Sequence, residues 1–117
     1  MAQVFAVIDD IFFLAKVQET AKQTGVELKT SRAAALPFDS LKENRPALII
    51  IDLEATSADA AELITQLKND DDLKEVPIIA YGRHTNTEKL QAAREAGADR
   101  VMPRSEFAAN LADILTT

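Results

Sequence analysis

The sequence has no cysteine, one histidine and only three glycines among its 117 residues. Without cysteine, disulfide bonds, thiolate zinc sites and thiol nucleophiles are excluded, which fits the reducing cytoplasm as the expected location. The single histidine, His84, cannot complete a zinc site of the usual four-ligand kind. The glycines at positions 25, 82 and 97 form no run that could cradle a phosphate group. An enzyme or a nucleotide-binding protein is therefore the least supported class, and we expect no enzyme.

Long hydrophobic runs and blocks of positive charge are also missing. The most apolar run, residues 47–51, is far shorter than the ~20 residues needed to cross a bilayer. No basic segment followed by an apolar stretch marks a secretory signal at the start. The net charge is −6, and an acidic surface repels the phosphate backbones of nucleic acids. We expect one domain over residues 1–117 that binds neither membranes nor nucleic acids.

The sequence does contain a regular alternation of short apolar runs and amphipathic segments. The apolar runs predict buried strands over residues 4–8, 26–30, 47–51, 76–81 and 99–102. The amphipathic segments predict helices over residues 11–24, part of 33–44, 56–69, 85–96 and from 105 onward. Expected N-terminal caps are Thr56 with Asp59, Thr85 with Glu88, and Ser105. This alternation predicts an α/β domain, a parallel sheet with helices on both faces.

Acidic residues follow two of the predicted strands. Asp9 and Asp10 end the first strand, and Asp52 ends the third. In open α/β sheets ligands bind beyond the carboxyl ends of the strands, so the three carboxylates converge if these strands are neighbours. Mg²⁺ suits such oxygen ligands, and one carboxylate could then act as a nucleophile toward a phosphoryl donor. The alternative is that these aspartates only form turns and cap helices.

With these acidic residues at the ends of its predicted strands, the sequence resembles the response-regulator receiver family over nearly its whole length. The segments that carry the resemblance are Ile8-Asp9-Asp10, Ile49-Ile50-Ile51-Asp52-Leu53, Val76-Pro77-Ile78-Ile79 and Glu95-Ala96-Gly97-Ala98-Asp99. The resemblance implies a flavodoxin-like fold, a single doubly wound five-stranded parallel sheet of strand order 2-1-3-4-5. It also implies Asp52 as phospho-acceptor and Mg²⁺ bound by Asp9, Asp10 and Asp52.

The sequence departs from the family pattern at the positions that switch the domain. Gly82 stands where receivers usually have Ser or Thr after strand four, and Arg104-Ser105 stands where they usually have Lys-Pro. Arginine keeps the positive charge, but its planar guanidinium differs from a compact ammonium. Val101 replaces the usual aromatic residue of strand five. The acidic pocket is therefore expected to be complete, while the switch is altered.

Two functions follow from this resemblance. The first is a two-component receiver that accepts a phosphoryl group from a sensor histidine kinase or phosphotransfer protein. The second is a pseudo-receiver that binds proteins or dimerises through its last helix, independently of phosphorylation. Arg104 is expected at the pocket, with a plain surface charge as the alternative.

Phe12 and His84 are candidates for a partner surface. A helix cannot point the adjacent Phe12 and Phe13 the same way, so one is expected in the core and the other beside the pocket. The alternative is an irregular helix start that buries both. For His84 the alternative is an ordinary loop residue.

Overall fold

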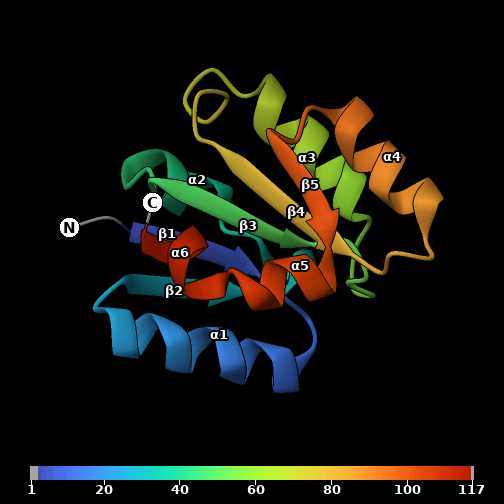
Figure 1. Cartoon of the computed structure of the whole chain (residues 1–117). Helices are drawn as coiled ribbons and strands as arrows, with labels where there is room; N and C mark the ends of the chain where they lie inside the picture. Colours follow the sequence, from blue (N-terminus) through green and yellow to red (C-terminus); the bar gives the residue numbers. More distant parts are fainter. Residues whose placement is uncertain (1–2, 117) are drawn as a thin grey trace.

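The computed structural model describes residues 3–116 and contains one parallel sheet of five strands (Figure 1). The strands are β1 (Gln3–Val7), β2 (Glu27–Ser31), β3 (Leu48–Asp52), β4 (Ile78–Gly82) and β5 (Arg100–Pro103). Their order across the sheet is β2-β1-β3-β4-β5, and every neighbouring pair is parallel. The sheet order and the doubly wound fold are therefore confirmed.

Helices cover both faces of the sheet (Figure 1). The helices α1 (Ile11–Thr24), α5 (Arg104–Ala109) and α6 (Leu111–Thr116) lie on one face. The other face carries α2 (Phe38–Glu43), α3 (Ala60–Asn69) and α4 (Thr87–Ala96), with the short 3-10 helix η1 (Ala33–Ala35) ahead of α2. Gly25 and Gly97 end α1 and α4 in the left-handed conformation, at φ 75° and 108°, where other residues are strained.

Three predicted helix starts are wrong. Asp59 rather than Thr56 caps α3, and its side chain accepts a hydrogen bond from the amide of Glu62. Asn86 rather than Thr85 caps α4. The last helix begins at Arg104, before Ser105, and breaks at Asn110 into α5 and α6. For α3 and α4 a polar residue one to three positions further on caps the helix instead, whereas α5 begins after Pro103 without a side-chain cap.

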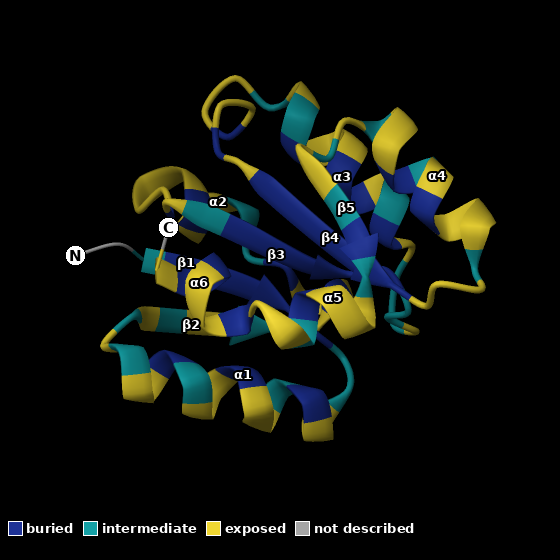
Figure 2. Ribbon diagram, viewed as in Figure 1, coloured by how far each residue is buried: buried dark blue, intermediate teal, exposed yellow. Residues whose placement is uncertain are grey.

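Two apolar layers hold the sheet between its helices (Figure 2). Ile50 and Ile79 face α1, α5 and α6, whereas Ile49 and Ile78 face α2, α3 and α4. Because side chains alternate along a strand, Asp52 projects on the same side as Ile50 and pairs in register with Tyr81. The pocket residue is thus built onto the end of a rigid central strand.

The described chain offers no candidate for a membrane-spanning helix. Among residues 3–116, no helix is both long and apolar enough to cross a bilayer.

Candidate functional site

A small polar pocket of about 210 Å³ lies beyond the carboxyl ends of the central strands. Its lining residues come from the segments after β1, β3, β4 and β5: Asp9, Asp10, Asp52, Glu54, Thr56, Arg83 and Arg104. The predicted acidic trio and Arg104 are therefore brought to one place, as parallel strands require. Four acidic and two basic side chains share this space.

Asp9 links three loops of the pocket. One carboxylate oxygen, Oδ1, accepts the amide of Ala33 at 2.9 Å, and the other accepts the amides of Thr56 at 3.0 Å and Ser57 at 2.7 Å. Partial burial alone would raise the pKa of Asp9, but these hydrogen bonds to the charged form hold it below the ordinary value. Asp9 thus fixes the position of the loops around the pocket.

Asp10 serves both the first helix and the pocket. Its Oδ1 accepts the amides of Phe12 at 3.0 Å and Phe13 at 3.2 Å, which caps α1. Its Oδ2 accepts a long hydrogen bond of 3.5 Å from Arg104 Nη2. The two interpretations of this aspartate, helix cap and pocket residue, therefore both hold.

Arg104 is held over the aromatic core. Its guanidinium carbon lies 4.4 Å from the centre of the Phe13 ring, a cation–π contact. Arg104 also lines the acidic pocket, where the sequence led us to expect it.

Asp52 is the buried carboxylate of the pocket. It is 5% exposed, and its Oδ1 accepts the amide of Glu54 at 2.8 Å. Burial raises the pKa of Asp52 above its ordinary value, although the Glu54 amide and the charge of Arg104 oppose the shift. A carboxylate in this environment is poorly solvated, so its charged form depends on the Glu54 amide and on the positive charge of Arg104.

Tyr81 pairs in register with Asp52 on the neighbouring strand, and its hydroxyl group is buried. Its ring stacks on Phe107 with centres 4.4 Å apart and lies 5.1 Å from the Phe13 ring. The hydroxyl oxygen is buried and, within residues 3–116, has no hydrogen-bond partner of good geometry. Burial, followed by the nearby charge of Asp52, raises the pKa of Tyr81 far above normal, so the phenol stays neutral.

Glu54 is a pocket residue that the sequence interpretation missed. A side chain added at Gly82 would place its Cβ 3.3 Å from Glu54 Oε2 and 3.3 Å from Leu53 Cβ. The same carboxylate accepts long hydrogen bonds from the Arg83 amide and Asn86 Nδ2, both 3.4 Å, and Lys89 Nζ lies 3.5 Å away. The missing side chain of Gly82 thus leaves room for a carboxylate that reaches the start of α4. The sequence did offer one indication of this role, because Glu54 lies two residues after Asp52, at the end of a predicted strand.

Metal ligation is not preformed in the described chain. Across residues 3–116, no group of three or more His, Cys, Asp or Glu side chains is arranged to hold a metal ion. Asp9 is the least available of the three aspartates, because both of its oxygens accept backbone amides, whereas Asp10 Oδ2 has only a long contact of 3.5 Å with Arg104. Asp10 and Asp52 remain in the same pocket, and two carboxylates suit Mg²⁺, which retains several waters.

The two candidate surface residues lie beside this pocket. Phe12 is 84% exposed whereas Phe13 is 5% exposed, which confirms that one of the two is in the core and the other at the surface. His84 is exposed and lines the same neighbouring groove as Phe12.

The similarity of the chain to known proteins agrees with this site. The model of the response regulator receiver domain matches residues 4–116. The transcriptional regulatory protein PrrA of Mycobacterium tuberculosis (strain ATCC 25618 / H37Rv) is 30% identical over 97 residues, which are 83% of this chain and 41% of PrrA. The chain thus spans about two fifths of the length of this curated relative.

Solved structures share the fold. The chemotaxis response regulator CheY4 of Vibrio cholerae superposes with a TM-score of 0.83 at 24% identity, covering 99% of this chain and 97% of that one. The Mn²⁺-bound form of response regulator Rcp1 gives a TM-score of 0.82 at 21% identity, covering 97% and 91%. The parallel sheet, the acidic residues at its carboxyl edge and the matched family model lead to one assignment: the chain belongs to the response regulator receiver domain family of two-component signalling.

Proposed function

We propose that the domain accepts a phosphoryl group on Asp52, with Mg²⁺ held in the same pocket by Asp10 and Asp52. The observation that carries the proposal is the buried, poorly solvated Asp52 carboxylate at a pocket with Arg104 and further acidic residues. In the transfer, a carboxylate oxygen of Asp52 bonds to phosphorus as the bond to the donor's leaving atom breaks. The donor would be a sensor histidine kinase or a phosphotransfer protein.

The residues of this chain have distinct parts in that transfer. Bound Mg²⁺ would neutralise charge on the transferring group and orient its oxygens. Arg104 supplies a positive charge at the pocket and lies opposite Asp10, 3.5 Å away. Asp9 holds the loops that frame the pocket, and Asp52 provides the nucleophile. Response regulator Rcp1, which shares this fold, has been solved in a Mn²⁺-bound form, and this supports a divalent cation here as well.

Two measurements test the proposal. Wild type and Asp52→Asn are incubated with acetyl phosphate and Mg²⁺, and their intact masses are compared. We expect a phosphoryl adduct on wild type alone. A Mg²⁺ titration followed by NMR should shift the amides of residues 9, 10, 52 and 82 in wild type, and less in Asp52→Asn. A folded wild type that gains no phosphoryl mass would contradict the proposal.

A second candidate is a pseudo-receiver that binds proteins or dimerises without phosphorylation, and Glu54 is the observation that favours it. The Glu54 carboxylate already contacts the β4–α4 loop that a phosphoryl group would have to move, and Gly82 offers no hydroxyl. This function predicts that the sedimentation behaviour and the NMR spectrum of α4, β5 and α5 are the same with and without the phosphodonor. A phosphodonor-dependent change in assembly would exclude it.

A further inference from the structure

A groove lies beside the acidic pocket, between the start of α1, the β4–α4 loop and the start of α5. Its volume is about 570 Å³, and its lining includes Phe12, Phe13, Lys16, Arg83, His84 and Arg104. It shares Arg83 and Arg104 with the acidic pocket, so the two are neighbours. The groove contains more space than the pocket itself.

The charge of this groove is opposite to that of the chain. The net charge is −6, yet Lys16, Arg83 and Arg104 converge here together with the single histidine, His84. All residues that line the groove lie within residues 3–116, and none of them is acidic. Such a local cluster of positive charge on an acidic domain attracts negative charge to this place in particular.

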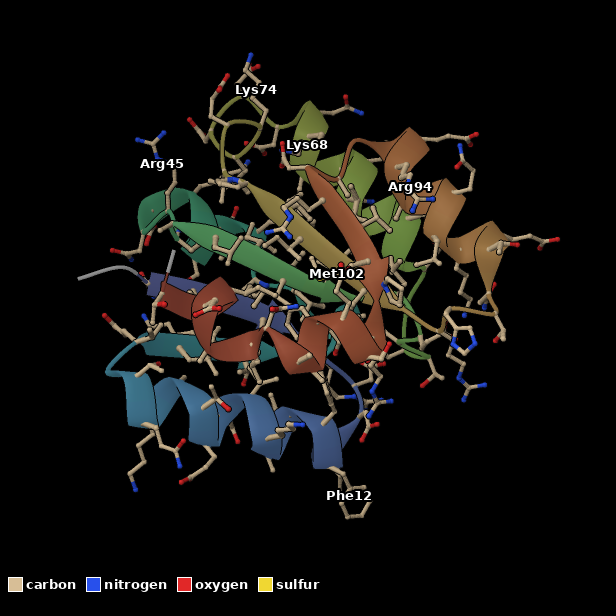
Figure 3. All side chains as sticks on the ribbon, in the orientation of Figure 1. Phe12, Arg45, Lys68, Lys74, Arg94 and Met102 are labelled. Atoms are coloured by element: carbon tan, nitrogen blue, oxygen red, sulfur yellow. The ribbon has the colours of Figure 1, made fainter. Side chains whose placement is uncertain are left out.

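The groove also has an exposed apolar edge. Ile11 is 70% exposed and Phe12 is 84% exposed, and among residues 3–116 they are the large hydrophobic side chains that reach solvent to this extent. Figure 3 shows Phe12 extending away from the start of α1 into solvent. An exposed aromatic ring with arginine nearby is the composition enriched at protein interfaces.

We propose that this groove docks an acidic segment of a partner protein that carries an aromatic or aliphatic side chain between its carboxylates. The apolar side chain would pack on Phe12, while the carboxylates would pair with Lys16, Arg83 and Arg104. Arg104 is already held over the Phe13 ring at 4.4 Å, so it loses little side-chain freedom on pairing. A nucleic acid is disfavoured as the occupant, because the net charge of −6 on the chain repels a phosphate backbone.

The docking can be measured on the unphosphorylated protein, so its test is separate from that of the proposed function. The two sites are nevertheless linked, because Arg104 also contacts Asp10 in the pocket. A carboxylate that attracts Arg104 toward the groove weakens this contact. A ligand that binds at Asp10 and a peptide that binds in the groove therefore change each other's affinity by the same factor.

The test is binding of a labelled acidic peptide, acetyl-Asp-Glu-Phe-Asp-Glu-Leu-amide, measured by fluorescence anisotropy and by NMR of the whole chain. We expect saturable binding with shifts confined to residues 11–16, 83–85 and 104–108. A peptide with lysine at the acidic positions should not bind. A peptide with alanine in place of phenylalanine and leucine should bind more weakly.

Charge-reversing variants show whether the groove is responsible. Lys16→Glu with Arg83→Glu should weaken binding about fivefold or more. The matched control is Lys29→Glu with Arg45→Glu, which makes the same charge change at exposed positions that do not line the groove; Arg45 lies far from Phe12 in Figure 3. The proposal would be overturned if both double variants lost the same peptide affinity, or if the NMR shifts were centred outside the groove. It would also be overturned if the peptide did not bind at millimolar concentration.

Discussion

Replacing Asp9 with asparagine tests whether this residue holds the loops of the pocket together. Both of its oxygens accept backbone amides, two on Oδ2 and one on Oδ1. Asparagine keeps one oxygen, so in either orientation its NH₂ group faces at least one amide donor. Hydrogen bonds to charged groups contribute about 1.5–3 kcal/mol each, and water can replace part of this at a half-exposed site. We expect Asp9→Asn to lower the free energy of unfolding by about 2 kcal/mol at pH 7.

Urea denaturation in metal-free buffer with EDTA measures this loss without any contribution from Mg²⁺. Asp71→Asn is the matched control, since the side chain of Asp71 is 96% exposed, and its change should stay within about 0.5 kcal/mol.

The pH dependence gives a second check on Asp9. Because the folded pKa of Asp9 is lowered, its stabilisation is complete above the unfolded pKa and is lost as the pH falls through the folded pKa. The difference between wild type and Asp9→Asn should therefore shrink in acid. A loss below about 0.5 kcal/mol at pH 7 would refute the idea that Asp9 connects the loops.

Three further predictions concern Tyr81, Asp52 and Gly82, which are buried at the ends of β3 and β4. Tyr81→Phe removes a buried hydroxyl that lacks a partner of good geometry, so it should raise the free energy of unfolding by about 1 kcal/mol; a comparable loss in urea denaturation would show that the hydroxyl is hydrogen bonded. Asp52→Asn should stabilise the fold by about 1 kcal/mol at pH 7. Because burial raises the folded pKa of Asp52, the folded state penalises its charged form, so the gain should fade as the pH falls through the folded pKa and be gone below the unfolded pKa; a pH-independent gain in thermal melts would argue against burial as the cause. Gly82→Ala should displace Glu54 and so increase amide hydrogen exchange at residues 83–89. The free energy of unfolding should change by less than about 1 kcal/mol. Unchanged hydrogen exchange would show that Glu54 does not hold this loop.

The fold could be predicted because its signals are local and repeated. Every strand lies within two residues of its predicted bounds, since runs such as residues 47–51 are apolar on both faces and must be buried. The convergence of Asp9, Asp10 and Asp52 required in addition that β1 and β3 be neighbours, which the resemblance to receivers implied. The strand bounds thus depended on periodicity, and the strand order depended on the resemblance.

The hydrogen bonds of the site could not be predicted in the same way. Asp9 bonds to amides of residues 33, 56 and 57, up to 48 positions away, and no pattern in the sequence encodes which amides face a given oxygen. The contact of Glu54 with the β4–α4 loop likewise depends on the direction of one flexible side chain across Gly82. The predicted starts of α3 and α4 were wrong because a second polar residue nearby caps each helix instead, and α5 begins without a side-chain cap.

The position of Tyr81 gives the domain a built-in optical reporter. The chain has one tyrosine and no tryptophan, so its intrinsic ultraviolet emission comes mainly from this phenol. The ring is 1% exposed and lies close enough to Asp52 for the two charge states of that carboxylate to affect it differently. Emission intensity is therefore expected to follow changes of charge at residue 52 in real time, in unlabelled wild-type protein.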